Sequence, residues 1–346
     1  MKVVHIESGL GNQMLGYVEY LAIKKNHPTE KCYIETIIYE IPEASEYICQ
    51  WNGYELDRIF GLDLPNIRDL FSDEAWEKVI DAVKESRFWE HSWNYPEAIV
   101  NALNIYGNLN LSNICVSNDI KRNRGWLREK LSEFFKTDLG YNIRRKIIEY
   151  NPNRIIARTK LPERLFFVDE RDLLCGFTLL FRFRGNQIET LEKEIRKSFV
   201  FPEFIENNNI EVANQIMSSD SVAIHVRRGD MVGGTQKYNS GGYFRRAVKL
   251  IKREVSNPQF YIFSDPDSVT WAKNNLKMLG LNRDDCIKFV DWNKGKESYR
   301  DMQLMTLCKN CIITLSSFSW WSAFLIDYKN KITVSPEVQI NTTHHC

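Results

Sequence analysis

The sequence predicts an α/β protein made of two units, each built around a parallel sheet. In the C-terminal part, short apolar runs alternate with segments of helical periodicity, and the same alternation opens the chain. The length of 346 residues fits two units, because a single hydrophobic core stops growing at about 250–300 residues. A content of 43% hydrophobic and 26% charged residues is typical of a folded globular protein.

The N-terminal unit begins with a strand and a helix. The run KVVHIE, at 2–7, is short and apolar and leads into glycines, after which apolar residues recur with helical spacing. A second apolar run, 32–41, is predicted to be a strand, and helices are expected near 72–86 and 127–149. The segment 200–221 contains a proline and an asparagine-rich run, so we place the domain boundary there and assign residues 1–205 to this unit.

The C-terminal unit, 206–346, alternates more regularly. Strands are predicted at 221–226, 259–264, 287–290, 311–316 and 331–336, with helices at 242–255, 267–279, 297–307 and 318–328 between them. Such a pattern is typical of βαβ units and a parallel sheet. Parallel sheets bind ligands beyond the carboxyl ends of their strands, so the residues directly after each strand are the candidates for function.

The charge balance excludes one class of function. With 46 Lys and Arg against 45 Asp and Glu, the net charge is +1, whereas a dedicated nucleic-acid binder is strongly basic. The charge is uneven along the chain: residues 1–100 carry 9 basic and 18 acidic side chains, and residues 101–200 carry 19 and 12. The basic region 121–164 is either a solvated helical face or a surface for peripheral association with an anionic membrane.

No targeting, membrane or metal signal is recognisable. No run reaches the roughly 18–20 apolar residues of a membrane-spanning helix, and the first apolar run is too short for a signal peptide. We therefore expect a cytoplasmic protein. The eight cysteines are scattered, and the pair Cys308 and Cys311 has no partner motif, so we expect reduced thiols and no metal site.

The loop after the first strand reads SGLGNQM. Gly9 and Gly11, with Asn12 beside them, would let backbone N–H groups approach an anion at a helix N-terminus. As a dinucleotide-binding fingerprint the loop is incomplete, because Met14 occupies the third glycine position and only Glu35 could serve as the acidic residue. A tight structural turn is an equally good interpretation of this loop.

The strand at 221–226 leads into the motif HVRRGD. Two adjacent arginines at the end of a strand, Arg227 and Arg228, are poor core residues and good ligands for phosphate, since a guanidinium donates two parallel hydrogen bonds. His225 would project to the same face as Arg227. Asp230 could orient an arginine or accept a proton, and a structural Arg–Asp pair is the alternative.

The next strand is followed by FSDPD. Asp265 and Asp267 form a literal DxD pattern, which in some enzymes holds a divalent metal on a diphosphate. Asp265 before Pro266 also fits the start of a helix, with Asp as the N-cap and Pro as the first helical residue. We favour the cap over the metal site.

The last candidate loop reads TLSSFSWWSAF. Ser316, Ser317 and Ser319 place hydroxyl groups and backbone amides at a helix N-terminus, which is a second site suited to an anion. The two tryptophans after them are expected to pack in the core. Asp301, at the start of the preceding helix, could accept hydrogen bonds from a nucleobase edge or be a plain surface carboxylate. Together the loops are suited to a nucleoside diphosphate.

Four motifs in this order resemble glycosyltransferase family 11, the α-1,2-fucosyltransferases. They are GLGNQM, HVRRGD, SYRDMQLM and LSSFSWWSAF, and the resemblance extends from Gly9 to Pro336. It implies a GT-B architecture, in which two Rossmann-like domains face each other across a cleft. It also implies inverting transfer of L-fucose from GDP-β-L-fucose to a galactoside, without a metal ion or other cofactor.

The resemblance also implies residue roles. Arg227 and Arg228 would hold the GDP diphosphate, His225 would help to seat the nucleotide and Asp301 would bond the guanine edge. Further donor contacts would come from Ser316, Ser317 and Phe318, and from Gly9, Gly11 and Asn12 on the acceptor side. Asp230 is the candidate general base, and the acceptor would be a galactose-containing glycan or a lipid-linked oligosaccharide.

The sequence departs from the family pattern in two places. Asp265-Pro266 stands where members often have an Asp-Asp pair, and the segment from Gly176 differs from the usual tryptophan- and serine-containing run. Two other functions stay open: an NAD-dependent oxidoreductase that uses the SGLGNQM loop, and a non-catalytic nucleotide- or glycan-binding module on the same fold.

Overall fold

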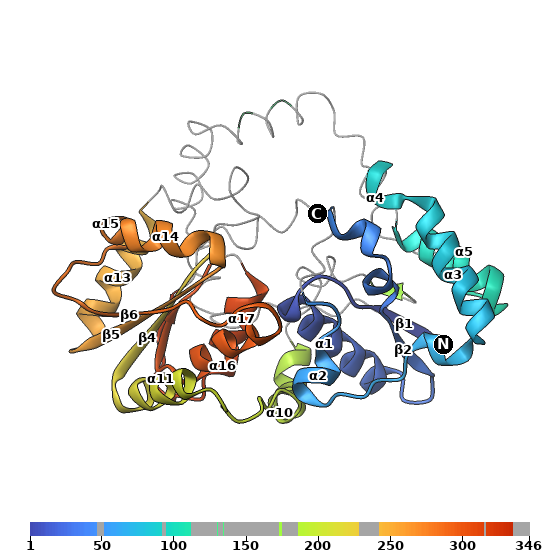
Figure 1. The fold of residues 1–346 in the computed structure, drawn as a ribbon. Coiled ribbons are helices and arrows are strands. Elements are labelled where there is room, and N and C mark those ends of the chain that lie inside the picture. The colour runs from blue at the N-terminus through green and yellow to red at the C-terminus, as the bar shows by residue number, and fades with distance from the viewer. Residues whose placement is uncertain are drawn as a thin grey trace.

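The computed structural model describes residues 1–46, 52–91, 95–111, 173–174, 186–227, 242–314 and 316–334, together with Lys130 and Phe134. In this part of the chain, two parallel sheets are present. One has three strands in the order β2-β1-β3, and the other has five in the order β6-β5-β4-β7-β8. The predicted α/β class with two parallel-sheet units is confirmed (Figure 1).

The N-terminal unit surrounds the smaller sheet. Its strands are β1 (Lys2–His5), β2 (Cys32–Glu35) and β3 (Leu173–Leu174); its helices are α1 (Leu10–Asn26), η1 (Ile37–Glu40), η2 (Pro42–Glu46), α2 (Leu56–Phe60), η3 (Ile67–Leu70), α3 (Asp73–Ser86), α4 (Phe88–His91), α5 (Tyr95–Gly107) and α10 (Asn186–Ser198). The strand predicted at 32–41 is too long, because the Glu35 carboxylate accepts the N–H of Ile37 at 2.7 Å and the chain turns into the 3₁₀ helix η1.

The C-terminal unit follows the predicted alternation. Its elements are α11 (Asn207–Ser218), β4 (Asp220–Val226), α13 (Tyr243–Glu254), β5 (Pro258–Ser264), α14 (Pro266–Asn274), α15 (Leu276–Leu279), β6 (Cys286–Val290), η5 (Gly295–Glu297), α16 (Tyr299–Leu307), β7 (Asn310–Ile312), α17 (Ser317–Leu325) and β8 (Thr333–Val334). The helix predicted at 267–279 is divided at Asn275, whose side chain bonds back to the carbonyl of Trp271. The last two strands are shorter than predicted.

The register of the larger sheet brings the strand ends together. In the parallel ladder Val226 pairs with Ser264, Phe263 pairs with Val290, and Ile224 pairs with Ile312. The loops that leave β4, β5, β6 and β7 therefore start from one edge of the sheet. This edge is where ligands bind in parallel α/β sheets.

A shared core joins the two units. Helices α1 and α17 lie side by side between the two sheets (Figure 1). Met14 and Val18 of α1 belong to one buried cluster with Met302 of α16 and Trp321 of α17. The predicted boundary at residues 205 and 206 falls between α10, which packs on α1, and α11, which packs on α16.

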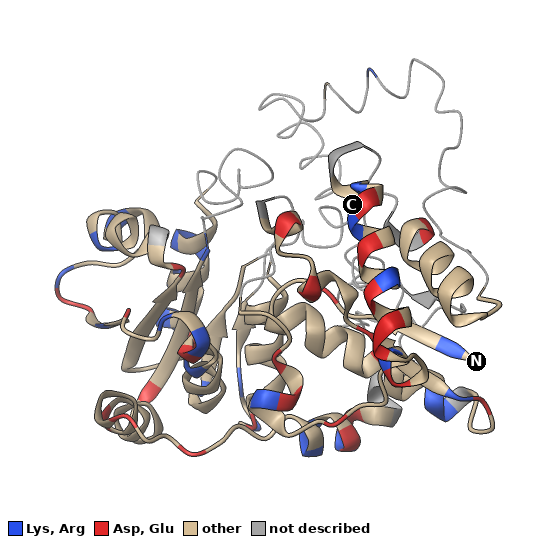
Figure 2. Cartoon of the chain, turned by 45° about the vertical axis from the view of Figure 1, so that its right-hand side comes forward, with Lys and Arg blue, Asp and Glu red and all other residues tan. Residues whose placement is uncertain are grey.

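Part of the acidic excess in residues 1–100 lies on helix α3 of the N-terminal unit. Helix α3 has the sequence DEAWEKVIDAVKES, with five acidic and two basic residues, and Figure 2 shows acidic residues on this side of the N-terminal unit. The basic region 121–164 lies outside the described residues, apart from Lys130 and Phe134. Among the described residues, no helix is both long and apolar enough to cross a membrane.

Candidate functional site

The carboxyl edge of the larger sheet collects the residues that the sequence picked out. Arg227 follows β4, Asp265 follows β5, and Ser316 lies between β7 and α17. The Nη1 group of Arg227 donates to the hydroxyl of Ser316 at 3.3 Å, so two motifs 89 residues apart meet here. Arg228 and Asp230 lie outside the described residues, and the roles predicted for them stay predictions.

His225 is a neutral residue at this edge. Its side chain is 6% exposed, its Nδ1 atom lies 3.2 Å from the hydroxyl of Thr314, and its ring packs at 5.7 Å from that of Phe318. Burial, together with the positive charge of Arg227, lowers the pKa of His225 to about 3. At neutral pH the ring therefore supplies hydrogen bonds and surface, and the positive charge comes from Arg227.

Two helix N-termini meet beside Arg227. A Cβ atom on Gly11, at the start of α1, would lie 2.6 Å from the backbone nitrogen of Phe318 and 2.7 Å from the backbone of Ser317. The hydroxyl of Ser317 donates to Oδ1 of Asn12 at 2.7 Å, and the indole N–H of Trp321 donates to the carbonyl of Gly11 at 2.9 Å. Because helix N-termini carry partial positive charge, this junction is suited to an anion.

The turn into α1 is strained and held by side chains. Ser8 has φ of +64°, in the left-handed region that non-glycine residues avoid. Its carbonyl accepts bonds from the Gln13 side chain at 2.9 Å and from the Tyr39 hydroxyl at 2.7 Å. Gln13 also bonds the carbonyl of Gly53 and the N–H of Glu55. From the sequence alone, Gln13 is recognisable only as a polar residue in a helix with an apolar face.

Two of the predicted residues hold the local structure. Ser319 is fully buried, and its hydroxyl bonds backbone groups of Thr314 and Ser316 within the turn. Asp265 precedes α14 as its N-cap residue with Pro266 next, as predicted, but its carboxylate accepts the hydroxyl of Ser268 at 2.7 Å instead of a backbone N–H. The side chain of Asp267 is outside the described residues.

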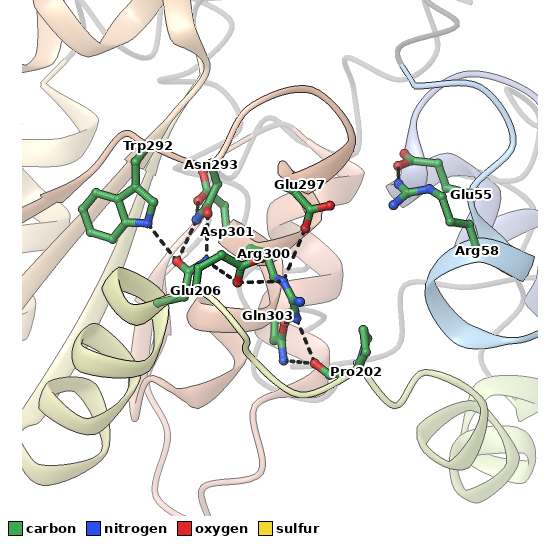
Figure 3. A network of polar contacts seen from close by, with 11 residues as sticks. Glu55, Arg58, Pro202, Glu206, Trp292, Asn293, Glu297, Arg300, Asp301 and Gln303 are labelled. Carbon is green, nitrogen blue, oxygen red and sulfur yellow. Dashed lines mark hydrogen bonds and ion pairs between the residues drawn. The ribbon is translucent and has the colours of Figure 1, made fainter.

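Asp301 stands in the first turn of α16 and belongs to a polar network with the loop after β6. Its Oδ1 atom accepts the side-chain N–H of Asn293 at 2.7 Å (Figure 3). Burial raises the pKa of the Asp301 carboxyl to about 8, although the bond from Asn293 acts in the opposite direction. Sequence reasoning missed Asn293, yet its place three residues after β6 was a usable signal.

The dinucleotide interpretation of the first loop is not supported by this geometry. Glu35 is fully buried, and its carboxylate bonds the ring of His5 and the N–H of Ile37. Met14, at the third glycine position, is in the core between the units. An acidic residue committed in this way is not available to the hydroxyls of a ribose.

A family comparison agrees with the motifs. The model of the family "Glycosyl transferase family 11" matches residues 177–345, which include Arg227, Asp301 and Ser316. Residues 177–345 are thus similar to glycosyltransferase family 11. The resemblance predicted from the motifs is confirmed for residues 177–345, whereas the loop at Gly9 to Asn12 lies outside the match.

Curated relatives resemble the same half. An alpha-1,2-colitosyltransferase of Escherichia coli is 34% identical over 131 residues, which are 36% of this chain and 43% of that protein. The O-antigen biosynthesis glycosyltransferase WbnK of Escherichia coli is 29% identical over 140 residues, 37% of this chain and 43% of that protein. The chain therefore matches less than half of the length of these two relatives.

A solved structure resembles the chain over a longer stretch. The NodZ alpha-1,6-fucosyltransferase co-crystallised with GDP covers 94% of this chain, and 92% of that chain is matched, at 14% identity and a TM-score of 0.43.

Proposed function

We propose that this protein transfers L-fucose from GDP-β-L-fucose to a hydroxyl group of a galactoside, with an α-1,2 linkage and inversion at the anomeric carbon. The acceptor would be a galactose-containing glycan or a lipid-linked oligosaccharide in surface-polysaccharide assembly. We further propose a cytoplasmic location, with the basic region 121–164 as a surface for peripheral membrane association.

One observation carries the proposal. Arg227, the N-terminus of α17 and the N-terminus of α1 converge at the carboxyl edge of the larger sheet, through the bonds Arg227–Ser316 and Ser317–Asn12. Asp301 lies in the first turn of α16, which starts from the same edge. A cationic and amide-rich junction is suited to a diphosphate, and a carboxylate is suited to a base with N–H groups.

The reaction follows from this distribution of charge. As the bond between the fucose C1 atom and the diphosphate oxygen breaks, negative charge develops on the diphosphate. Arg227 and the N–H groups of α17 stabilise this charge with donors that are already in place. The acceptor hydroxyl forms the new bond from the opposite face of C1 and loses its proton, for which Asp230 is the proposed base, and GDP leaves. In this proposal the fixed cation and helix N-termini supply the charge, so no metal ion is required.

The name of one relative points to a second candidate donor, GDP-colitose. The relative at 34% identity is named an alpha-1,2-colitosyltransferase. Colitose is L-fucose without its 3-hydroxyl group, so GDP-colitose would place the same diphosphate and base in the site. The choice between the two donors depends on whether the chain hydrogen-bonds the 3-hydroxyl of the sugar.

The direct experiment is a donor panel with a set of β-galactoside acceptors and EDTA present. We expect turnover with GDP-fucose or GDP-colitose, and a product whose linkage analysis shows substitution at the 2-position of galactose. UDP-glucose and GDP-mannose serve as controls. No transfer from either GDP-deoxysugar, or transfer that needs a divalent metal, contradicts the proposal.

A further inference from the structure

We propose that Trp292, Asn209 and Asn293 form a directional hydrogen-bond relay that orients Asp301 to accept from a nucleobase with two adjacent N–H donors. These three are positioning residues, since they act through Asp301. The inference rests on the proposed function, because it concerns the base of the nucleotide donor. Figure 3 shows the side chains of Trp292, Asn293 and Asp301 gathered in one polar network.

The direction of the relay starts at Trp292. An indole N–H can only donate, and that of Trp292 donates to Oδ1 of Asn209 at 2.9 Å. The oxygen of the Asn209 amide must therefore face Trp292, and it also accepts from Nδ2 of Asn293 at 3.2 Å. The carboxylate of Glu206, an acceptor, lies 3.2 Å from the amide nitrogen of Asn209, which fixes the same orientation independently.

Asn209 passes this orientation to Asn293. Asn209 is fully buried, so its amide has no bulk water to bond to. Its Nδ2 group donates to Oδ1 of Asn293 at 2.9 Å. Asn293 must then present its own nitrogen to Asp301, and this nitrogen donates to Oδ1 of Asp301 at 2.7 Å. The relay thus makes Oδ1 of Asp301 an acceptor.

The second oxygen of Asp301 is the one left for a ligand. Oδ2 has no hydrogen-bond partner among the described residues, and the Asp301 side chain is only partly buried. When the carboxyl is ionised, both oxygens accept, and a base that offers two N–H groups fits. Guanine offers N1–H and the 2-amino group side by side, whereas adenine has an acceptor nitrogen at that edge.

Ionisation couples base binding to pH. Because burial, together with the negative charge of Asp291, raises the pKa of Asp301 to about 8, the ligand-free carboxyl is largely protonated at neutral pH. A base that donates two hydrogen bonds needs the ionised form, so its binding releases one proton. The bond from Asn293 stabilises the ionised form, and losing this bond raises the pKa further.

Neighbouring contacts keep α16 in place while this happens. Arg300 is 3% exposed and donates to the carbonyl of Pro202 and to the Gln303 side chain, both at 2.9 Å. Its guanidinium lies near the rings of Phe204 and Tyr299, at 5.4 and 4.8 Å from their centres. The first turn of α16 is therefore anchored independently of Asn293, and removing Asn293 should leave Asp301 near its place.

The experiment is GDP binding by calorimetry between pH 6.5 and 9, with wild type and Asn293→Ala. For wild type we expect affinity to rise about tenfold per pH unit below pH 8 and then level off, with proton release on binding. Asn293→Ala should weaken GDP binding about tenfold at pH 7 and shift the pH dependence of the affinity to higher pH. The difference in affinity between this variant and wild type should therefore be smaller at pH 9 than at pH 7. If Asn293 had only a structural role, raising the pH would not restore the GDP affinity of the variant. ADP, measured at pH 7.5, should bind more weakly than GDP.

Two further variants keep the test decisive. Trp292→Phe removes the donor N–H but keeps an aromatic ring, and we expect a smaller shift in the same direction even where Asn293→Ala folds poorly. Asn275→Ala, which removes an amide between α14 and α15, should leave the pH profile unchanged. A pH profile identical in wild type, Asn293→Ala and Trp292→Phe overturns the relay, whereas wild type that does not bind GDP contradicts the proposed function itself.

Discussion

At the scale of single residues, burial decides which groups carry charge at the site. His225 stays neutral because burial and Arg227 lower its pKa to about 3, and Asp301 holds a proton near neutral pH because burial raises its pKa to about 8. Arg227 keeps its charge at any working pH. Of these three groups, Arg227 is therefore the one suited to a diphosphate that gains negative charge.

Arg227→Ala should lower kcat/KM by about 10²–10³-fold, as the loss of one preorganised donor to a developing anion typically does. Steady-state assays with the active GDP-sugar measure this effect. Arg253→Ala is the matched control, because the Arg253 side chain on α13 is 72% exposed and pairs with Glu254. Equal activity of the two variants contradicts the role assigned to Arg227.

Ser8→Gly should stabilise the protein. The left-handed conformation of Ser8 costs about 1–2 kcal/mol for a residue with a Cβ atom, and glycine gives back about 0.5–1 kcal/mol in backbone entropy. We expect the free energy of unfolding in urea to rise by up to about 1 kcal/mol. Ser72→Gly, at the N-cap of α3 with φ of −68°, should instead lower it slightly. A loss of stability in Ser8→Gly argues against strain at this turn.

At the scale of elements, the contact between α1 and α17 positions the site. Their N-termini approach so closely that Gly11 has no room for a side chain, and Trp321 covers the junction from the buried side. Close packing of this kind fixes the two helix N-termini relative to each other. The site therefore depends on both units.

Gly11→Ala should destabilise the protein and reduce its activity. The added methyl group meets backbone atoms of Ser317 and Phe318, which cannot rotate away, and such overpacking costs about 1–3 kcal/mol. Gly16→Ala in the same helix is the control, because the one close contact of its methyl group is with the end of the Ile6 side chain, which can move, and its backbone contact with His5 is an ordinary 3.7 Å. Urea unfolding and donor turnover measure both variants. If Gly11→Ala and Gly16→Ala had similar stability and turnover, close contact between the N-termini of α1 and α17 would not be required.

At the scale of the whole molecule, two titratable groups with raised pKa values, His5 and Asp301, shape the response of stability to alkaline pH. His5 lies between the carboxylates of Glu35 and Glu7. Burial acts to lower its pKa, but the two carboxylates outweigh burial and raise the pKa to about 10. Asp301 has the same sign of shift, from 3.8 to about 8. Each folded-state group holds a proton over a pH range in which the unfolded chain has released it.

The urea midpoint should therefore fall between pH 7 and pH 9. His5 contributes stability that is complete below its unfolded pKa of 6.5 and is lost as the pH rises toward 10. The stability that protonated Asp301 contributes is also lost as the pH rises, and this loss is complete near pH 8. His225 acts in the opposite direction and only near pH 7, because its pKa is lowered from 6.5 to about 3. Asp301→Asn should make the urea midpoint less dependent on pH below pH 8, and His5→Gln should make it less dependent on pH above pH 8. A midpoint that rises with pH contradicts both shifts.

Much of this arrangement was predictable from local pattern. Apolar periodicity and turn residues are short-range signals, so the strands of the C-terminal unit and the places of Arg227, Asp265 and Ser316 after them follow from the order of residues alone. The strand predicted at 32–41 was partly wrong because a side-chain bond from Glu35 competed with the apolar pattern.

The rest depends on residues far apart in the chain. Asn12 and Ser317 are 305 positions apart, and their hydrogen bond exists only because the shared core brings α1 against α17. The protonation of Asp301 likewise depends on burial and on Asn293, which no local pattern records. Local order thus determined which groups stand at the sheet edge, and only tertiary packing determined which of them touch, which carry charge and which way each amide points.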